Sequence, residues 1–230
     1  KWSQNGVTLA GGHGHGGATN QLNSPIGLFV DDDQTVVIAD CWNHRIMQWK
    51  NGDTTNGRVV AGGTGAGNGL NQLNWPTDVL IGKETDSLII CDYGNRRVVR
   101  WSRRLSMDEQ RYLYVSGYVK HEVRRYQLGE KNGTLVAGGN EPGDEINQLS
   151  YPTYLFVDRQ QNVYVSDTRN HRVMRWTQGD KKQGTVIVSG NEEGEEANQF
   201  WNPIGLSFDR HGNLYVVDCY NYRVQRFSIK

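Results

Sequence analysis

The chain has 230 residues, and its 25 basic and 25 acidic side chains leave no net charge. This balance argues against a function that depends on net charge alone, such as nonspecific binding to nucleic acid or to membranes. No run of about 18 apolar residues occurs, so the sequence predicts no membrane-spanning helix. Short alternating runs of aromatic and β-branched residues argue against disorder, although the mean hydropathy is low.

One unit recurs along the chain: a Gly-rich loop, a proline and three short strands around a turn of the form Asp-x-x-Asn-x-Arg. The loops contain Asn-Gln-Leu or Asn-Gln-Phe, starting at Asn20, Asn71, Asn147 and Asn198. The turns start at Asp40, Asp92, Asp167 and Asp218. A strand-rich repeat of this length predicts an all-β propeller rather than an ordinary domain.

The first complete unit predicts four antiparallel strands, which make one blade. In chain order they cover residues 27–31, 35–40, 44–49 and 58–62. Residues 44–49 alternate with a period of two, as expected when one blade packs between two others. Residues 6–11, which precede this unit, are expected to form an outer strand without inner strands of its own.

Later second strands are predicted at 88–90, 112–115, 163–165 and 214–217, giving five four-stranded blades in all. The interval from Asp92 to Gly117 is only 25 residues, whereas Asp40 and Asp92 are 52 apart. About half a repeat is therefore absent between Arg104 and Leu105. Either a true deletion leaves a three-stranded blade there, or residues are missing from the sequence; we favour missing residues, because an unpaired edge inside a ring is costly. A six-bladed ring with missing residues is the alternative.

The chain ends are predicted to complete each other. Residues 222–228 form a third strand without an outer strand after it, and residues 6–11 supply one. Pairing of these segments would close a single propeller domain over residues 1–230 without an open edge. Lys1-Trp2 is similar to the end of a repeat strand, so the chain looks like a piece of a longer protein.

The repeated turns and loops resemble those of the NHL-repeat β-propellers. The Asn-His-Leu tripeptide of that family reads Asn43-His44-Arg45 here, with related triplets at 95–97, 170–172 and 221–223; the third blade departs, with Gly117 and Lys120. Family rings usually have six blades. The resemblance implies diverse roles: protein-binding ends of ubiquitin ligases, single-stranded RNA binding, sensor ectodomains, and a zinc-dependent lyase that cleaves peptidyl-hydroxyglycine.

Large aromatic residues concentrate in the turns and in the crossing loops that lead from one blade to the next. Both emerge at the same end of a blade, where aromatic side chains give contact area at little entropic cost. The predicted ligand-binding residues are Trp42, Trp75, Tyr93, Tyr151 and Trp201. The turn aspartates, Asp40, Asp92, Asp167 and Asp218, are predicted to be structural, as hydrogen-bond acceptors within the turns.

The histidines do not predict a metal centre. His44 and His171 occupy a slot that also holds Arg96 and Tyr222, and His13 with His15 would supply only two ligands. The predicted inner strands contain no histidine, which weakens the resemblance to the lyase. We predict no catalytic residue, metal or cofactor.

The predicted function is therefore a non-catalytic interaction module that binds a protein, peptide or glycan. A metal-dependent lyase or hydrolase of the same fold is the first alternative. Single-stranded RNA binding is the second, because residues 96–125 are basic, but acidic crossing loops near 141–145 and 192–196 disfavour it. The glycosylation sequon at Asn132 is compatible with secretion, which slightly favours an extracellular location; the oligomeric state is left open.

Overall fold

The computed structural model describes residues 3–53, 55–82, 87–101, 112–127, 133–158, 160–177, 183–189 and 192–228. The chain divides into two compact units. We call Gly6–Met107 with Ser207–Ser228 the terminal unit, and Asp108–Leu206 the central unit, to which Lys1–Asn5 and Ile229–Lys230 are also assigned. Each unit is described by itself.

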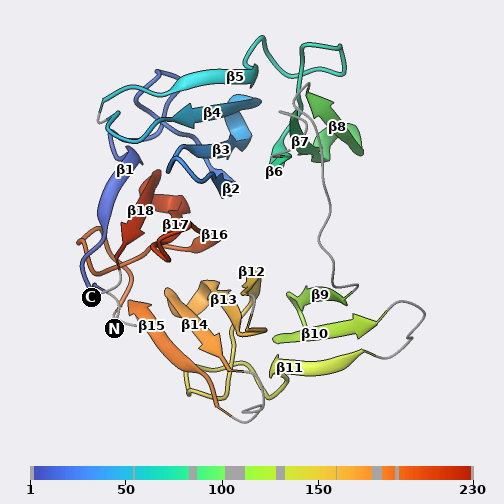
Figure 1. Cartoon of the computed structure of the whole chain (residues 1–230), viewed down its shortest axis with the longest axis vertical. Coiled ribbons are helices and arrows are strands. Elements are labelled where there is room, and N and C mark those ends of the chain that lie inside the picture. The colour runs from blue at the N-terminus through green and yellow to red at the C-terminus, as the bar shows by residue number, and fades with distance from the viewer. Residues whose placement is uncertain are drawn as a thin grey trace. The chain divides into compact units, whose positions relative to one another are not determined.

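In the terminal unit, the first complete blade has the strand order β2-β3-β4-β5 (Figure 1). These strands are β2 (Pro25–Val30), β3 (Val36–Asp40), β4 (Arg45–Trp49) and β5 (Arg58–Gly62). The next sheet contains β6 (Pro76–Gly82), β7 (Ser87–Asp92) and β8 (Arg97–Trp101). The two blades share a buried cluster that joins Val37 and Ile46 to Val79 and Ile90.

The terminal strands meet in one four-stranded sheet, ordered β1-β18-β17-β16. It contains β1 (Val7–Gly11), β16 (Pro203–Phe208), β17 (Leu214–Asp218) and β18 (Arg223–Phe227); the division between the units falls within β16. Val7 of β1 lies opposite Arg226 of β18, and Gly11 lies opposite Arg223, in antiparallel register. Closure of the whole chain as one ring, and its single domain, stay predictions.

The central unit contains two further blades. A three-stranded sheet has the order β11-β10-β9, with β9 (Tyr112–Gly117), β10 (Glu122–Gln127) and β11 (Thr134–Gly138). A four-stranded sheet follows, with β12 (Pro152–Val157), β13 (Val163–Asp167), β14 (Arg172–Trp176) and β15 (Thr185–Ser189). Val123 and Leu149 pack there against Met174 and Trp176.

The structure confirms an all-β propeller of antiparallel blades. Among the described residues, three of the five sheets have four strands and two have three. Arg104 and Leu105, where missing residues are predicted, lie outside the described residues, as does Asn132 of the sequon. No helix in the described part of the chain is long and apolar enough to cross a membrane.

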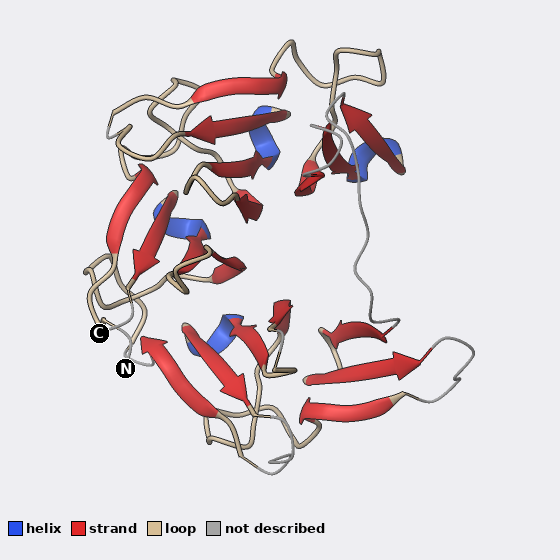
Figure 2. Ribbon diagram, in the orientation of Figure 1, coloured by secondary structure: helices blue, strands red, loops and turns tan. Residues whose placement is uncertain are grey.

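Short 3-10 turns follow the second strand in four blades and are blue in Figure 2. They are η1 (Cys41–Asn43), η2 (Tyr93–Asn95), η3 (Thr168–Asn170) and η4 (Cys219–Asn221). Each ends at a left-handed residue. At η1 and η4 the outer strand ends beside this residue, because the Gly63 amide donates to the His44 carbonyl oxygen and the Gly12 amide to that of Tyr222. Gly62 has a φ of 67°, and a Cβ there would meet the His44 carbonyl oxygen, which favours glycine at this strand end.

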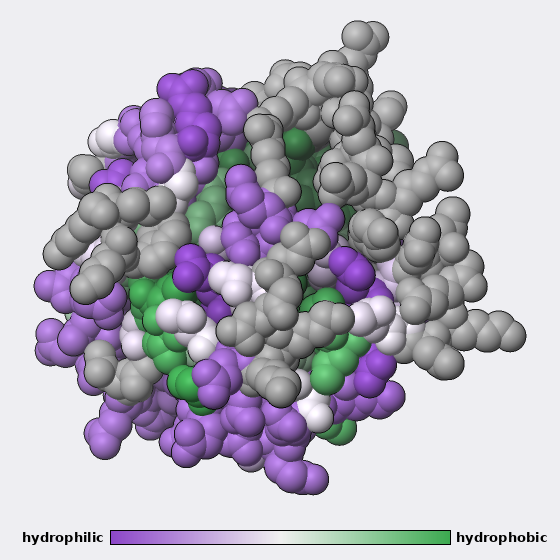
Figure 3. Space-filling model, turned by 60° about the horizontal axis from the view of Figure 1, so that its bottom comes forward, coloured by the Kyte–Doolittle hydropathy of each residue, from purple (hydrophilic) through white to green (hydrophobic). Residues whose placement is uncertain are grey.

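The Leu or Phe of each crossing loop anchors the loop in the core. Leu22, Leu73, Leu149 and Phe200 are all fully buried. The preceding glutamine shapes the loop itself: Gln148 Oε1, for example, accepts a hydrogen bond from the Glu145 amide. These buried anchors fix the base of each loop and leave its remaining side chains free to face solvent. On the face drawn in Figure 3, hydrophobic residues reach the surface in patches set among hydrophilic ones.

Candidate functional site

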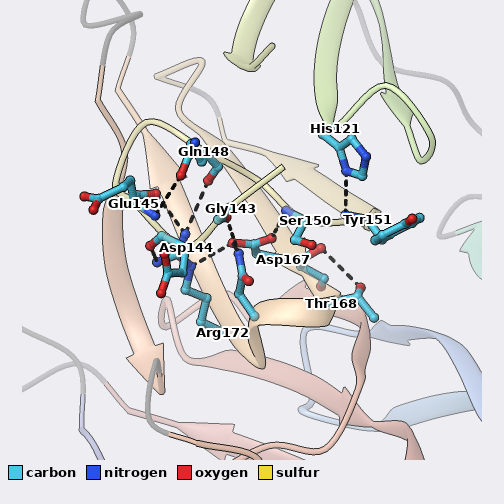
Figure 4. A network of polar contacts seen from close by, with 12 residues as sticks. His121, Gly143, Asp144, Glu145, Gln148, Ser150, Tyr151, Asp167, Thr168 and Arg172 are labelled. Atoms are coloured by element: carbon cyan, nitrogen blue, oxygen red, sulfur yellow. Dashed lines mark hydrogen bonds and ion pairs between the residues drawn. The ribbon is translucent and has the colours of Figure 1, made fainter. Parts of the chain in front are cut away.

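A buried carboxylate lies at the centre of each Asp-containing turn. Asp167 Oδ1 accepts a hydrogen bond from the Ser150 amide at 2.6 Å, while Oδ2 accepts from Asn170 at 2.8 Å and from Arg172 Nε at 2.7 Å (Figure 4). Asp40, Asp92, Asp167 and Asp218 are all 0% exposed. The predicted structural aspartates thus lie in polar networks that tie the turn to the crossing loop of the same blade.

The turn arginine holds the crossing loop by its backbone. Arg172 donates to the carbonyl oxygens of Asp144, Glu145 and Gln148, at 2.5, 3.0 and 3.3 Å. Arg45 binds the equivalent carbonyls of Gly17, Ala18 and Gln21, and Arg97 those of Asn68, Gly69 and Gln72. The five donors of a guanidinium suit this role because one side chain can bridge several carbonyls at once.

Burial and hydrogen bonding have opposite effects on the pKa of these carboxylates. Desolvation raises the pKa of Asp40 and of Asp167 above the ordinary value, while the bonds from the turn asparagine, the turn arginine and a loop amide act to lower it. Each carboxylate has the buried or half-buried guanidinium of its own turn at 2.7 Å. Removing one partner would leave the other charge uncompensated.

The third turn is built differently. Gly117 replaces the aspartate, and the buried Glu122 instead pairs with Arg124 at 2.8 Å. This turn still places His121 in the left-handed conformation, with a φ of 52°. His121 is not recognisable in the sequence as a member of the repeated slot, because the flanking Asp and Asn of the turn are absent. Its position directly before the third strand is the signal that identifies it.

Three histidines of this slot make the same contact with the next crossing loop. The Nδ1 atom of His44 accepts a hydrogen bond from the Trp75 amide at 3.2 Å. His121 Nδ1 accepts from Tyr151 at 3.1 Å, and His171 Nδ1 accepts from Asn202 at 3.2 Å. The slot is therefore structural for these rings, and each histidine joins its own blade to the loop that follows.

The predicted ligand-binding aromatics are exposed, and they are shared between the two units. Trp42, Trp75 and Tyr93, of the terminal unit, are 64%, 48% and 65% exposed. Tyr151 and Trp201, of the central unit, are 37% and 40% exposed. Within each unit these side chains lie on turns and crossing loops, as expected; that all five form one binding surface stays a prediction.

Trp75 and Tyr151 adopt a conformation that large residues rarely take. Their φ angles are 49° and 50°, in the left-handed region, directly before Pro76 and Pro152. Bulky residues with positive φ are outliers, and such strain costs about 1–3 kcal/mol. The equivalent positions hold Ser24 and Asn202, both smaller, so the conformation itself does not require an aromatic side chain.

Tyr151 is the centre of a small aromatic cluster in the central unit. Its ring is 5.0 Å from that of Tyr118 and 4.7 Å from that of His121, the latter edge to face at 88°. The guanidinium carbon of Arg169 lies 5.8 Å from the centre of the Tyr151 ring, within cation–π range. The role of Arg169 could not be inferred from sequence, because no sequence pattern shows that this turn residue lies near Tyr151 of the crossing loop.

The remaining histidines and cysteines have other surroundings. No group of three or more His, Cys, Asp and Glu that could hold a metal occurs among the described residues. His13 Nδ1 lies 3.0 Å from the Gly11 carbonyl oxygen. The centre of the His15 ring lies 5.6 Å from that of the Tyr222 ring, and the two rings are tilted by 43°. Burial raises the pKa of Cys41 to about 12 and that of Cys219 to about 11, which keeps both thiols protonated and unreactive at neutral pH.

Comparisons with known proteins agree with this architecture. The NHL repeat family matches residues 22–49 and 200–227, and a search of curated protein sequences found no match. An auxiliary nutrient binding protein from Bacteroides thetaiotaomicron is similar over 99% of this chain and 77% of its own, at 12% identity and a TM-score of 0.66. A luciferin-regenerating enzyme is similar over 91% of this chain and 92% of its own, at 9% identity and a TM-score of 0.58. A gluconolactonase from Xanthomonas campestris is similar over 93% and 88%, at 14% identity and a TM-score of 0.53. Identities this low show a shared fold alone.

Proposed function

We propose that this β-propeller, whose chain carries NHL repeats, is a non-catalytic module that binds a protein, peptide or glycan through the aromatic side chains of its loops. One observation carries the proposal. Trp75 and Tyr151 are both large, both partly exposed and both held at positive φ by the same contact to the preceding blade.

The backbone conformation of Trp75 and Tyr151 costs free energy in the unbound protein. A Trp at a φ of 49° is strained, and its exposed ring gains little from burial in the free protein. Strained residues cluster at ligand-binding sites, where the surrounding structure maintains a conformation that suits the bound state. A rigid ring that is already in place also loses little entropy on binding, which favours affinity.

Protein, peptide and glycan partners all fit these exposed aromatic residues for the same reason. Each can stack or pack against an exposed indole or phenol ring, and aromatic anchors often dominate binding energy. The similarity in fold to an auxiliary nutrient binding protein from Bacteroides is compatible with ligand capture by such a fold. The lactonase and the luciferin-regenerating enzyme keep an enzymatic alternative open, because their folds are similar too.

The test uses two variants that imitate another loop of the same chain. Trp75→Asn and Tyr151→Asn copy Asn202, which takes a φ of 61° and donates its amide to His171 in the same way. Both variants are therefore expected to fold. Wild-type protein is screened on a glycan array and against a displayed library of linear peptides, and the ligands recovered are measured by calorimetry.

We expect each variant to weaken binding of a recovered ligand by about 30-fold or more, corresponding to about 2 kcal/mol for an aromatic anchor. The matched controls are Leu70→Asn and Ile146→Asn, which remove exposed apolar side chains from the same two crossing loops. They should change affinity less than threefold. Unchanged affinity in the double variant Trp75→Asn/Tyr151→Asn would refute the proposal.

The enzymatic alternative has its own arm. Stoichiometric zinc in the purified protein, with turnover of a peptidyl-hydroxyglycine or lactone that a chelator stops, would favour the lyase or hydrolase instead. A gel shift with single-stranded RNA that weakens steeply with salt would favour the RNA-binding alternative.

A further inference from the structure

We propose that His44 and His121 are positioning residues that hold Trp75 and Tyr151 in their presented conformation only while Nδ1 is unprotonated. Presentation of the two aromatic residues then depends on pH. This inference rests on the proposed function insofar as it assigns recognition to Trp75 and Tyr151.

The His44–Trp75 and His121–Tyr151 contacts have the same geometry, and in both the imidazole binds a backbone amide rather than a side chain. A left-handed turn residue projects its imidazole towards the next crossing loop, and its Nδ1 accepts the amide hydrogen of the residue before the loop proline. Figure 4 shows His121 above the Tyr151 amide, with the phenol ring turned away from the bond. The bond fixes the backbone of the residue whose ring is exposed.

The hydrogen-bond direction determines the protonation state. A backbone amide is always a donor, so Nδ1 must offer its lone pair, and the neutral ring carries its proton on Nε2. An imidazolium has a proton on both nitrogens and can accept nothing. Protonation therefore replaces an attraction with two N–H groups that face each other, about 3.1–3.2 Å apart between nitrogens.

Strain makes the aromatic residues sensitive to this loss. Trp75 and Tyr151 occupy the left-handed region at a cost, and the imidazole bond is one of the contacts that offset it. Histidine is the side chain that ordinarily changes charge between pH 5 and 8. Acidification is therefore expected to release both residues towards ordinary backbone conformations and to move their rings.

The charges around His44 are few. Asp40 and Arg45 of its own turn bind each other at 2.7 Å. The next turn contacts the crossing loop through the Gly94 amide, which donates to the Asn74 carbonyl oxygen. The charged residues of that turn are Asp92, Arg96 and Arg97. The crossing loop at 63–75 contains no ionisable side chain. No ion pair to the His44 ring occurs among the described residues.

The surroundings of His121 are more charged. Its own turn contributes Lys120 and Glu122, and Glu122 is paired with Arg124. The crossing loop that contains Tyr151 also carries the acids Glu141, Asp144 and Glu145, and Arg169 of the next turn lies 5.8 Å from the centre of the Tyr151 ring. His121 itself makes no ion pair among the described residues, and its ring faces Tyr151 edge to face.

The other members of the slot provide internal contrasts. His171 makes the same bond to Asn202, but its Nε2 also lies 3.5 Å from Glu193 Oε2, an acid that favours the protonated ring. Tyr222 has no imidazole, and the crossing-loop residue at the equivalent position is Ser24, which takes a φ of 51° without this bond. Ser24 is small and has no ring to present, so it lacks the bulk that makes this conformation costly for Trp75 and Tyr151. In the part of the chain that the structure describes, an aromatic residue before the loop proline always follows a histidine turn.

The test measures Trp75 directly and needs no partner. The intact chain is labelled with 5-fluorotryptophan at its seven Trp positions, and Trp75 is assigned by the loss of its ¹⁹F resonance in Trp75→Asn. We expect the Trp75 resonance to shift with a single titration between pH 8 and 5. Trp42, exposed on the first turn with its amide bonded to the Asn23 carbonyl oxygen, is the matched control and should not follow it.

Two variants remove the titrating group. His44→Tyr copies Tyr222, and His44→Asn keeps a short acceptor in a residue type that tolerates positive φ. In both, the Trp75 titration should disappear. A Trp75 resonance that is independent of pH in the wild type, or one that still titrates in the two variants, would overturn the proposal.

A second measurement uses the wild-type protein, so the proposal can be tested even if the His44 variants do not fold. With ¹⁵N-labelled histidine, His44 and His121 should show an unprotonated Nδ1 and a protonated Nε2 at pH 8. The opposite tautomer would equally reject the proposal.

Binding separates this inference from the proposed function. A glycan or peptide recovered at pH 8 should bind wild-type protein at least tenfold more weakly at pH 5, and the double variant His44→Asn/His121→Asn should bind it with a flat pH profile. Equal wild-type affinity at both pH values would contradict the inference alone. Absence of any recovered ligand contradicts the proposed function, while the fluorine and nitrogen measurements still decide whether the histidines position Trp75 and Tyr151.

Discussion

At the scale of single residues, one buried carboxylate organises each Asp-containing turn. Asp167 receives bonds from the Ser150 amide, Asn170 and Arg172, and both it and Arg172 are buried. The carboxylate therefore serves the turn and the crossing loop together. Its removal would leave a guanidinium inside the protein without its counter-charge.

We predict that Asp167→Ala lowers the free energy of unfolding by about 3–5 kcal/mol, the range for removal of one partner from a buried pair. Urea denaturation monitored by tryptophan fluorescence measures it. Asp33→Ala, at an exposed acid in a strand-connecting turn, is the control and should stay within about 0.5 kcal/mol of wild type. A loss below about 1 kcal/mol at Asp167 would mean that the network contributes little.

Residue-level features were the hardest to predict from sequence. The Asp, Asn and Arg of the turn form a local pattern, so their roles could be inferred from residue type and spacing. The contact between His44 and the Trp75 amide could not, because it joins two blades and depends on left-handed backbone at both residues. Propensity alone would not place a Trp there, since bulky side chains avoid that conformation.

At the scale of elements, the strands follow the alternation in the sequence closely. Residues 58–62 are strand β5 as predicted, and the predicted third strand at 44–49 is β4 (Arg45–Trp49). Strand pairing was predictable because each blade repeats the same register. What could not be predicted is the exposure of individual blade faces, which depends on the neighbours of each sheet.

Strand β8 illustrates this dependence. Ile46, Val123, Val173 and Val224 occupy one position of the third strand in four blades, and all are 0% exposed. Val98, at the same position of β8, is 69% exposed. The sheet of β8 is one of the two that contain three strands among the described residues.

We predict that Val98→Thr changes the free energy of unfolding by less than about 0.5 kcal/mol, because its hydroxyl remains in water. The same change at the buried Val173 should cost about 1–3 kcal/mol, because it buries a hydroxyl where the methyl group was. Paired chemical denaturation curves of the two variants measure the difference. Equal losses at both sites would show that Val98 is buried in solution.

At the scale of the whole molecule, the pairing of β1 with β18 joins residues from opposite ends of the sequence. Ala10 of β1 packs in a buried cluster with Leu22 and Val224, so the strand contributes apolar contacts as well as backbone bonds. Without β1, the edge of β18 would be left open. The predicted ring closure depends on this strand.

We predict that deletion of residues 1–12 lowers the melting temperature by at least about 5 °C, since 1 kcal/mol corresponds to about 2–4 °C for a chain of this size. Differential scanning calorimetry measures it. Deletion of residues 1–5, which ends before β1, is the control and should lower the melting temperature by less than about 2 °C. Equal melting of the two truncated proteins would contradict a stabilising role for β1.

The arginine contacts have a consequence for how this scaffold can change over generations. Arg45, Arg97 and Arg172 donate hydrogen bonds to backbone carbonyl oxygens of their crossing loops, and every amino acid supplies such a carbonyl. The loops at 12–24, 63–75, 139–151 and 190–202 are also equal in length, although some are acidic and others lack charge. The other residues of a crossing loop can therefore vary widely, provided that the buried Leu or Phe and the glutamine before it are kept. Changes in the exposed residues of the crossing loops can thus alter what the protein binds without disturbing the Asp–Arg networks that tie each turn to its loop.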